Sequence, residues 1–242
     1  MGKDWIWHYI NCARREMMYK NRMRMGLRLK SGLRNFSTST LACLFSILWG
    51  CAGHQIIITK DPLSVEEHIK LGQAYEIKGE LELALQEYEK GLEKDNTNCM
   101  GYFGIGNIYY KKGNLSDAET FYKKAIEYTD ADDPRNGLFY NNLSWVYIEG
   151  NKDLKQAETF AQRALSLDPS MSFVYLDTLG VVYTRLNEFE KAEEALLSAL
   201  KNAPDDKDAL IQINTHLFEL YEITGNRNKL NEVSQRLQGL GK

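Results

Sequence analysis

The stretch "LDTLGVVYTRLNEFEKAEEALLSALKNAP", Leu176–Pro204, decides the fold, because its pattern of small residues and tyrosine occurs four times in the chain. Gly180 stands three positions before Tyr183, and two further small residues, Ala192 and Ala199, follow seven positions apart. Three earlier stretches align with it, and they begin at His68, Tyr102 and Tyr140. The four tyrosines are separated by 34, 38 and 36 residues, so the chain repeats a unit of nearly constant length.

The same residue types recur at the same places in every unit. The small residue and the tyrosine that follows it are Gly72/Tyr75, Gly106/Tyr109, Ser144/Tyr147 and Gly180/Tyr183. The later small residues are Ala84, Ala118, Ala157 and Ala192, and then Gly91, Ala125, Ala164 and Ala199. Apolar residues at helical spacing occupy both halves of each unit, which predicts two amphipathic helices per unit. We expect the small residues to lie where these two helices cross, with the tyrosine packed beside them.

Signals for turns lie between the expected helices. The dipeptides Lys78-Gly79, Lys112-Gly113 and Leu186-Asn187 fall where the two helices of a unit must be joined. Gly and Asn tolerate the left-handed backbone that such a turn needs. Pro169 and Pro204 follow the second helix of the third and fourth units, where proline stops a helix and turns the chain.

Together these features resemble the tetratricopeptide repeat, a pair of antiparallel helices with a period near 34 residues. The resemblance covers Val65–Leu240 and implies an all-α fold, in which helix pairs stack into a right-handed superhelical solenoid and residues 65–242 form one repeat domain. Four units are clear, and a degenerate fifth unit begins at Asp208. That unit keeps Tyr221 but has Leu230 where alanine is expected. Departures from the repeat pattern are expected in a terminal unit, because one of its faces has no neighbouring unit.

In proteins of this family the first helix of each pair lines an inner groove that binds extended or helical segments of partner proteins. The resemblance implies a protein partner and assigns these positions to the groove: Phe103, Asn107, Tyr110, Lys111, Asn141, Trp145, Ile148, Glu149, Asp177, Thr184 and Arg185. Tyr110 and Trp145 are the expected exposed anchors, because aromatic residues often dominate binding surfaces. The alternative for Trp145 is packing between neighbouring helices. Ile69 and Gln73 occupy the positions of the Lys/Asn clamp with which some members hold a terminal carboxylate, so binding of that kind is not expected.

The chain before the repeats carries a short apolar run, Leu41–Trp49, after basic residues and a polar spacer. About nine apolar residues suit the core of a signal peptide and fall short of the ~20 that a membrane-spanning helix needs. The end of the run, Leu48-Trp49-Gly50-Cys51, resembles the bacterial lipobox, although Trp49 stands where a small residue is usual. That resemblance implies removal of residues 1–50, lipidation of Cys51 and a linker over residues 51–64.

The sequence around the lipobox leaves several readings of the front end open. Because Ala52 follows the cysteine, the resemblance favours the bacterial outer membrane, facing the periplasm, over an inner-membrane anchor. The alternatives are an uncleaved anchor from about Phe36 to Ile58 and simple secretory cleavage at another site. Residues 1–22 fit a signal peptide poorly, so we predict that the biological start is Met23 or Met25.

Charge is divided unevenly along the chain. Residues 1–50 carry +7 and residues 51–242 carry −10, which together give the net charge of −3. A basic segment ahead of an acidic body is typical of a targeting segment on a globular domain. The acidic body repels phosphate backbones, so nucleic acid is not an expected partner.

Residues suited to catalysis or metal binding are scattered. None of His8, His54, His68 and His216 has a partner at metal-ligand spacing on one helix. We expect His68 to be packed at a core position and Cys99 to be a small buried hydrophobe. The sequence also contains no glycine-rich phosphate loop and no nucleophile elbow, so we predict no enzyme activity, no cofactor and no metal.

The predicted function is that of a lipid-anchored periplasmic adaptor, which binds a segment of an envelope protein in its groove. Lipid-anchored repeat proteins of this size resemble the pilotins, which guide secretins of type IV pili and secretion systems, and adaptors of peptidoglycan hydrolases. A secreted or single-span-anchored repeat protein without lipid is the further alternative. The readable repeat residues specify the superhelix and not its cargo, so they do not choose among these partners.

Overall fold

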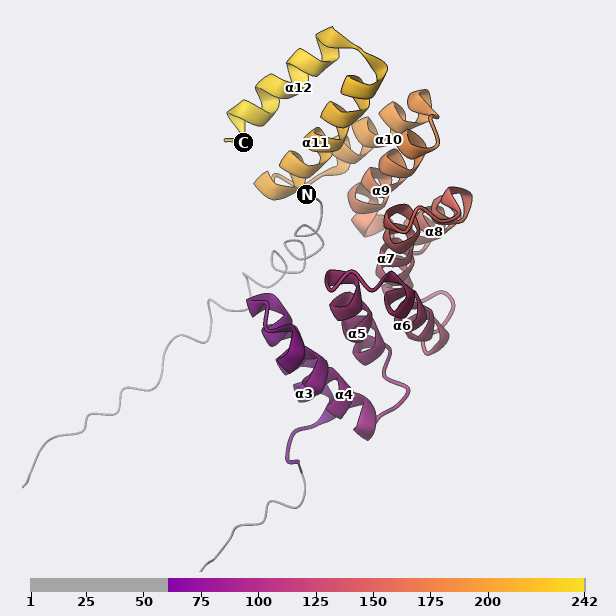
Figure 1. Ribbon diagram of the computed structural model, residues 1–242, viewed down its shortest axis with the longest axis vertical. Coiled ribbons are helices and arrows are strands. Elements are labelled where there is room, and N and C mark those ends of the chain that lie inside the picture. Colours follow the sequence, from indigo (N-terminus) through magenta and orange to yellow (C-terminus); the bar gives the residue numbers. More distant parts are fainter. Residues whose placement is uncertain (1–60, 242) are drawn as a thin grey trace, which may run out of the picture. The chain divides into compact units, whose positions relative to one another are not determined.

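A computed structural model describes residues 61–241, and within them all regular structure is helical (Figure 1). These residues form ten α-helices and one short 3-10 helix without any strand, which confirms the all-α prediction. The elements are α3 (Val65–Lys78), α4 (Leu81–Lys94), α5 (Cys99–Lys111), α6 (Leu115–Glu127), α7 (Arg135–Glu149), α8 (Leu154–Leu167), η1 (Pro169–Met171), α9 (Ser172–Arg185), α10 (Phe189–Asn202), α11 (Lys207–Thr224) and α12 (Arg227–Gly239).

The predictions for the front of the chain lie outside the described residues. They concern the signal segment over residues 1–50, the start at Met23 or Met25, and lipidation of Cys51. Within residues 61–241, no helix combines the length and the apolar character that a membrane crossing requires.

The helices form five consecutive pairs, which correspond to the four clear units and the degenerate fifth one. The two helices of each pair pack against each other, and the second helix of a pair packs against the first helix of the next (Figure 1). The first helices α3 and α5, α7 and α9, and α9 and α11 also contact each other directly. This arrangement confirms a solenoid of stacked helix pairs.

The small residues of the repeat lie where the helices of a pair approach closely. A Cβ atom added at Gly106 would lie 2.6 Å from the ring of Tyr122, and one added at Gly180 would lie 2.4 Å from Leu196. In both places the side chain nearest the glycine comes from the second helix of the same pair. A glycine therefore allows a large side chain to pack directly on the backbone of the first helix.

The turns form where the sequence predicts them. The backbone φ angle is 78° at Gly79, 77° at Gly113 and 59° at Asn187, so all three adopt the predicted left-handed conformation. The first helix begins with a capping box, in which the Ser64 side chain accepts from the backbone of Glu67 and the Glu67 carboxylate accepts from the backbone of Ser64.

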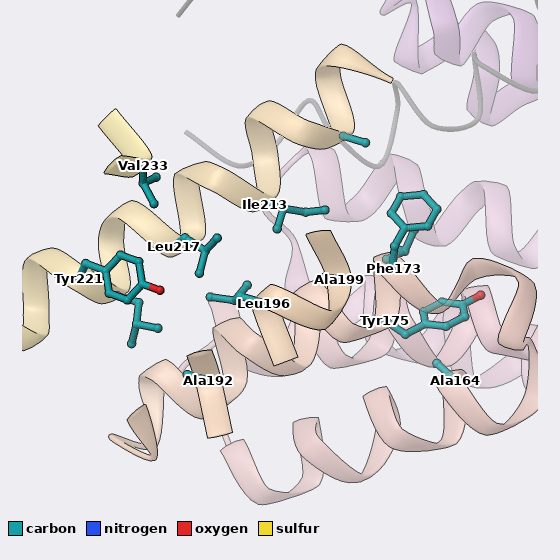
Figure 2. Packing of buried hydrophobic residues seen from close by; sticks show 13 residues of the cluster. Ala164, Phe173, Tyr175, Ala192, Leu196, Ala199, Ile213, Leu217, Tyr221 and Val233 are labelled. Atoms are coloured by element: carbon teal, nitrogen blue, oxygen red, sulfur yellow. The ribbon is translucent and has the colours of Figure 1, made fainter. Parts of the chain in front are cut away.

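The hydrophobic core is shared between neighbouring pairs. Its largest cluster draws side chains from α8, α9, α10, α11 and α12, and Figure 2 shows Leu196 of α10 and Leu217 of α11 together within it. Other clusters join the first pair to the second and the second to the third. Because each pair completes its core with its neighbours, no pair buries its apolar face alone.

Candidate partner-binding surface

The five first helices, α3, α5, α7, α9 and α11, together form what we call the first-helix surface. Side chains on this surface are hydrogen-bonded from one first helix to the next. At its start, Lys111 Nζ of α5 lies 2.8 Å from Glu76 Oε1 of α3. The other carboxylate oxygen of Glu76 accepts a bond of 2.8 Å from the hydroxyl of Tyr88 on α4. Glu76 is only 6% exposed, so this carboxylate is held from two sides in a nearly dry position.

The second joint connects α5 to α7 through Asn107. Its side-chain oxygen accepts bonds of 2.9 Å from the Tyr122 hydroxyl and 3.1 Å from the Asn142 amide. All three side chains are buried. One oxygen therefore satisfies two buried donors that come from different helix pairs.

Two further joints connect α7, α9 and α11. Thr178 of α9 donates to Asn141 of α7 over 2.8 Å, and it accepts from the indole nitrogen of Trp145 over 3.0 Å. Asp177 of α9 accepts a 2.8 Å bond from Nδ1 of His216 on α11. We call these cross-helix bonds the polar ladder. Because each rung joins successive units, the ladder fixes the register of one unit on the next.

A first pocket of about 180 Å³ opens on the N-terminal part of this surface. Its lining comes mostly from α3 and α5 and includes Gln73, Glu76, Phe103 and Asn107. A Cβ at Gly104 would lie 2.3 Å from the ring of Tyr88, so the glycine lets this ring lie against α5 and form part of the wall. The pocket combines an apolar lining with the bonded carboxylate of Glu76.

A second pocket of about 440 Å³ lies between the C-terminal halves of α9 and α11. From α9 it is lined by Val181, Thr184 and Arg185, and the α11 side contributes His216, Glu219, Glu222 and Ile223. The two walls therefore carry charges of opposite sign, with two carboxylates facing one guanidinium.

The predicted groove residues differ widely in exposure. Six are buried, three are half-buried, and two, Glu149 and Arg185, are exposed. The buried ones are Phe103, Asn107, Tyr110, Asn141, Ile148 and Asp177, and the half-buried ones are Lys111, Trp145 and Thr184. Phe103 and Asn107 lie at the first pocket, whereas Thr184 and Arg185 lie at the second. Whether these residues contact a partner remains a prediction.

The expectation that Tyr110 is an exposed anchor is wrong. Tyr110 is 8% exposed and belongs to the core cluster that contains Phe103 and Phe139. Burial, reinforced by the neighbouring Glu149 carboxylate, raises the pKa of the Tyr110 hydroxyl above its ordinary value. The cluster around Tyr110 includes Phe139 and Leu143 of α7, so the following unit helps to bury the ring, which no single repeat unit reveals.

Trp145 takes the alternative position, between neighbouring helices. It is half-buried, bonded to Thr178 of α9, and its ring centroid lies 6.1 Å from that of His216 on α11. The packing predicted for His68 and Cys99 is confirmed, because they are 0% and 6% exposed.

The α11 residues of the second pocket are not among the predicted groove positions, because the fifth unit is degenerate and terminal. Counting from its tyrosine finds two of these four residues. Glu222 and Ile223 follow Tyr221 by one and two positions, as Thr184 and Arg185 follow Tyr183. The rule that assigned groove positions in the fourth unit thus assigns them in the fifth.

A different set of interactions lies near the turns between paired helices, and we call it the turn-side clusters. Tyr147 of α7 donates a 2.8 Å bond to Glu119 of α6, which also pairs with Lys123 and Lys152. Burial acts to raise the pKa of Glu119, but bonds from Lys123, Lys152 and Tyr147 outweigh it and lower the pKa to about 2. Glu193 repeats this arrangement with Tyr221 and Lys229 on α11 and α12. Among residues 61–241, no three His, Cys, Asp or Glu side chains converge in a way that could hold a metal ion.

Comparison with known proteins identifies the repeats. Family models described as "Tetratricopeptide repeat" match residues 99–132, 139–171 and 175–206, and one described as "TPR repeat" matches residues 72–113. Together the matches cover slightly more than half of the chain. The three tetratricopeptide matches begin and end close to the pairs α5–α6, α7–α8 and α9–α10, whereas the match over 72–113 runs from α3 to just beyond α5.

Two curated relatives resemble the chain in sequence. The TPR repeat-containing protein MJ1428 of Methanocaldococcus jannaschii is 26% identical over 137 residues, which are 54% of this chain and 24% of that protein. The type IV pilus assembly protein PilF of Pseudomonas aeruginosa is 26% identical over 124 residues, or 51% of this chain and 48% of PilF. The chain thus spans between a quarter and a half of the length of these relatives.

Solved structures show the same fold. The type IV pilus biogenesis factor PilW has a TM-score of 0.64 at 17% identity, over 73% of this chain and 77% of PilW. Pseudomonas aeruginosa PilF has a TM-score of 0.60 at 19% identity, over 74% and 78% of the two chains. YrrB, described as a TPR protein with an unusual peptide-binding site, has a TM-score of 0.52 at 22% identity, over 73% and 86%. With its helix pairs and its matched repeats, the chain belongs to the tetratricopeptide repeat family.

Proposed function

We propose that this protein is a lipid-anchored adaptor of the bacterial envelope, which binds a segment of a partner protein on its first-helix surface. The observation that carries the proposal is the pair of pockets on that surface, each lined by side chains from two successive first helices. Tetratricopeptide repeat proteins bind other proteins or peptides, and pockets of this kind offer concave sites in which partner side chains are desolvated.

The lipid anchor is supported by the sequence before the repeats. A basic segment, a short apolar run and Leu48-Trp49-Gly50-Cys51 follow one another in the order of a lipoprotein precursor. Several acyl chains on Cys51 hold a protein firmly at a membrane, whereas one chain alone is marginal. Confinement to a membrane raises the effective concentration of a partner there, so modest affinity in each pocket suffices.

The anchor is tested by replacing the cysteine that would carry it. The full chain and its Cys51→Ser variant are expressed in a bacterium and labelled with radioactive palmitate. We expect label on the wild-type protein in the membrane fraction and none on Cys51→Ser. Cys43→Ser is the matched control, because Cys43 lies in the segment that cleavage would remove, and it should be labelled like the wild type. Equal labelling of Cys51→Ser would contradict the anchor.

Partner binding is tested by site-specific photo-crosslinking in living cells. A photoreactive amino acid is placed at Gln73 in the first pocket, at Arg185 in the second, or at Leu197 of α10, which is 44% exposed and outside both pockets. We expect discrete crosslinked species from the two pocket positions and none from Leu197. A crosslinking pattern that is the same at all three positions would contradict binding on the first-helix surface.

A pilotin-like role is the second candidate, and the likeness to PilF and PilW favours it. Each of these two proteins of type IV pili matches about three quarters of this chain and of itself in fold. The role predicts that deletion of the gene leaves secretin subunits monomeric and mislocalised, as seen by fractionation and by gels that preserve multimers. Unchanged secretin multimers would contradict the pilotin-like role. The more general adaptor role, including that of an adaptor for peptidoglycan hydrolases, would then remain.

A further inference from the structure

We infer that the second pocket receives a lysine or arginine side chain, flanked by an aliphatic residue, from the partner segment. This inference rests on the proposed function, because it gives the chemistry of what the first-helix surface binds. It follows from the charged and apolar side chains that line this pocket and from the pairing of a lysine with the corresponding carboxylate of the first unit.

A contact rule concerns the two positions that directly follow the repeat tyrosine, and it joins one unit to the preceding one. The second residue after the tyrosine of one unit reaches the first residue after the tyrosine of the preceding unit. Lys111 pairs in this way with Glu76 over 2.8 Å, and Glu149 acts in this way on the Tyr110 hydroxyl. The contact is thus seen at the first two junctions between units, once as an ion pair and once with a neutral hydroxyl.

Glu222 occupies in the fifth unit the position that Glu76 occupies in the first. Glu76 receives Lys111 from the following unit. Neither Glu222 nor its neighbour Glu219 forms an ion pair with any residue in 61–241. A cationic side chain of a partner would therefore take the place that Lys111 has in the first pocket.

Charge within the second pocket points to the same ligand. Two carboxylates and the single guanidinium of Arg185 leave a net charge of −1. Helices α9 and α11 both end at this pocket, at Arg185 and Thr224, and the C-terminal end of a helix carries partial negative charge that favours cations. Asp177 does not add to this charge at the surface, because it is buried and bonded to His216.

Apolar side chains beside the carboxylates account for the flanking aliphatic residue. Ile223 is 60% exposed, the largest value among the large hydrophobic side chains of residues 61–241, and it lines the pocket together with Val181. A single exposed isoleucine is common on protein surfaces. Next to Glu219 and Glu222, however, it lets a lysine or arginine lay its aliphatic stem and its apolar neighbour on the wall while the charged end reaches the carboxylates.

End-to-end stacking of two copies of this chain does not supply the cation. If its first pair stacked on the last pair of another copy, the contact rule would bring Ile77 to Glu222, because Ile77 is the second residue after Tyr75. Isoleucine supplies no cation. A peptide that carries the basic and aliphatic pair is therefore the appropriate probe of this pocket.

The test pans a phage library of random 12-residue peptides on the purified full chain in detergent. We expect enriched peptides to carry Lys or Arg next to Leu, Ile or Val. Synthetic copies of these peptides should bind the Glu219→Gln/Glu222→Gln variant about tenfold more weakly than the wild type, because two partly desolvated charge contacts are lost. The Glu190→Gln/Glu194→Gln variant, which loses the same charge on the exposed side of α10, should bind them as the wild type does.

The outcomes separate this inference from the proposed function. Peptides without basic residues, or equal affinity of the wild type and Glu219→Gln/Glu222→Gln, would overturn the inference. If the enriched peptides lost affinity only for the Gln73→Lys variant, which alters the first pocket, the proposed function would stand and the inference about the second pocket would fail. A library that yields no peptide above background would overturn both. Circular dichroism of each variant shows that a change in affinity does not come from unfolding.

Discussion

The polar ladder and the turn-side clusters both join neighbouring helix pairs, but the ladder does so through buried hydrogen bonds and the clusters through accessible ion pairs. The ladder consists of side chains that are nearly all buried, such as Asn107, Asn142 and Asp177, with 6%, 2% and 1% of their surface exposed. The turn-side clusters rely on lysines that remain accessible, and the side chains of Lys123 and Lys152 are 55% and 39% exposed. A buried polar group without its partner is costly, whereas an exposed ion pair contributes little. We therefore expect the ladder to determine how well the units hold together.

The largest effect is expected at the last rung of the ladder. His216→Leu removes the partner of Asp177 and leaves a buried carboxylate with no bond to α11, which should lower the free energy of unfolding by about 3 kcal/mol. Urea unfolding followed by circular dichroism measures this. Glu219→Gln, on the exposed side of the same helix, should change the value by less than about 0.5 kcal/mol. An equally small decrease in the free energy of unfolding for His216→Leu would show that this rung does not stabilise the fold.

A smaller loss is expected at the second rung. Asn107→Leu keeps the size of the side chain but leaves the Tyr122 hydroxyl and the Asn142 amide without their shared acceptor. At about 1 kcal/mol for each donor, the free energy of unfolding should fall by about 2 kcal/mol. The same urea experiment measures it. A variant as stable as the wild type would mean that water or another acceptor replaces the asparagine oxygen.

A turn-side substitution should cost less than either rung. Glu119→Gln removes the charge that pairs with Lys123 and Lys152 but keeps a group that can accept from Tyr147. We expect a loss of about 1 kcal/mol at low salt, which shrinks when sodium chloride is raised to 1 M because exposed charges are screened. A loss that equals that of His216→Leu, or one that is insensitive to salt, would remove the contrast between the two regions.

The smallest effect is the pH dependence of the same site. The pKa of Glu119 falls from 4.5 to about 2 on folding, so its stabilising contribution is complete above pH 4.5 and is lost as the pH falls toward 2. The difference in unfolding free energy between wild type and Glu119→Gln should therefore be constant from pH 7 to about pH 5 and decrease below pH 4.5. A difference that grows on acidification would contradict the lowered pKa.

The fold could be predicted from the sequence because the same pattern of small residues and tyrosine occurs in four units. Small residues at Gly106 and Gly180 and left-handed turns at Gly79 and Asn187 depend on contacts inside one helix pair, and one unit is enough to anticipate them. The candidate surface was harder to predict. Tyr110 packs in a cluster with side chains of the following unit, and Trp145 bonds to the next first helix, so their exposure depends on how units stack.

The residues on α11 were within reach of the same reasoning. Glu222 and Ile223 keep their distance from Tyr221 even though the second helix of that unit has lost its alanine. A degenerate unit can therefore retain the positions that form a surface while it changes those that pack. Pocket positions are better found by counting from the tyrosine than by overall similarity of the unit.

The polar ladder also has a mechanical consequence. Its rungs connect successive first helices one after another, from Glu76 and Lys111 at one end to Asp177 and His216 at the other. A tensile load applied between the first and last helix pairs is shared at each junction by the rung and the core cluster beside it, and the junctions act in series, so the weakest junction sets the force at which the solenoid yields. In pulling experiments we therefore expect that weakening a single rung lowers the stiffness of the whole solenoid.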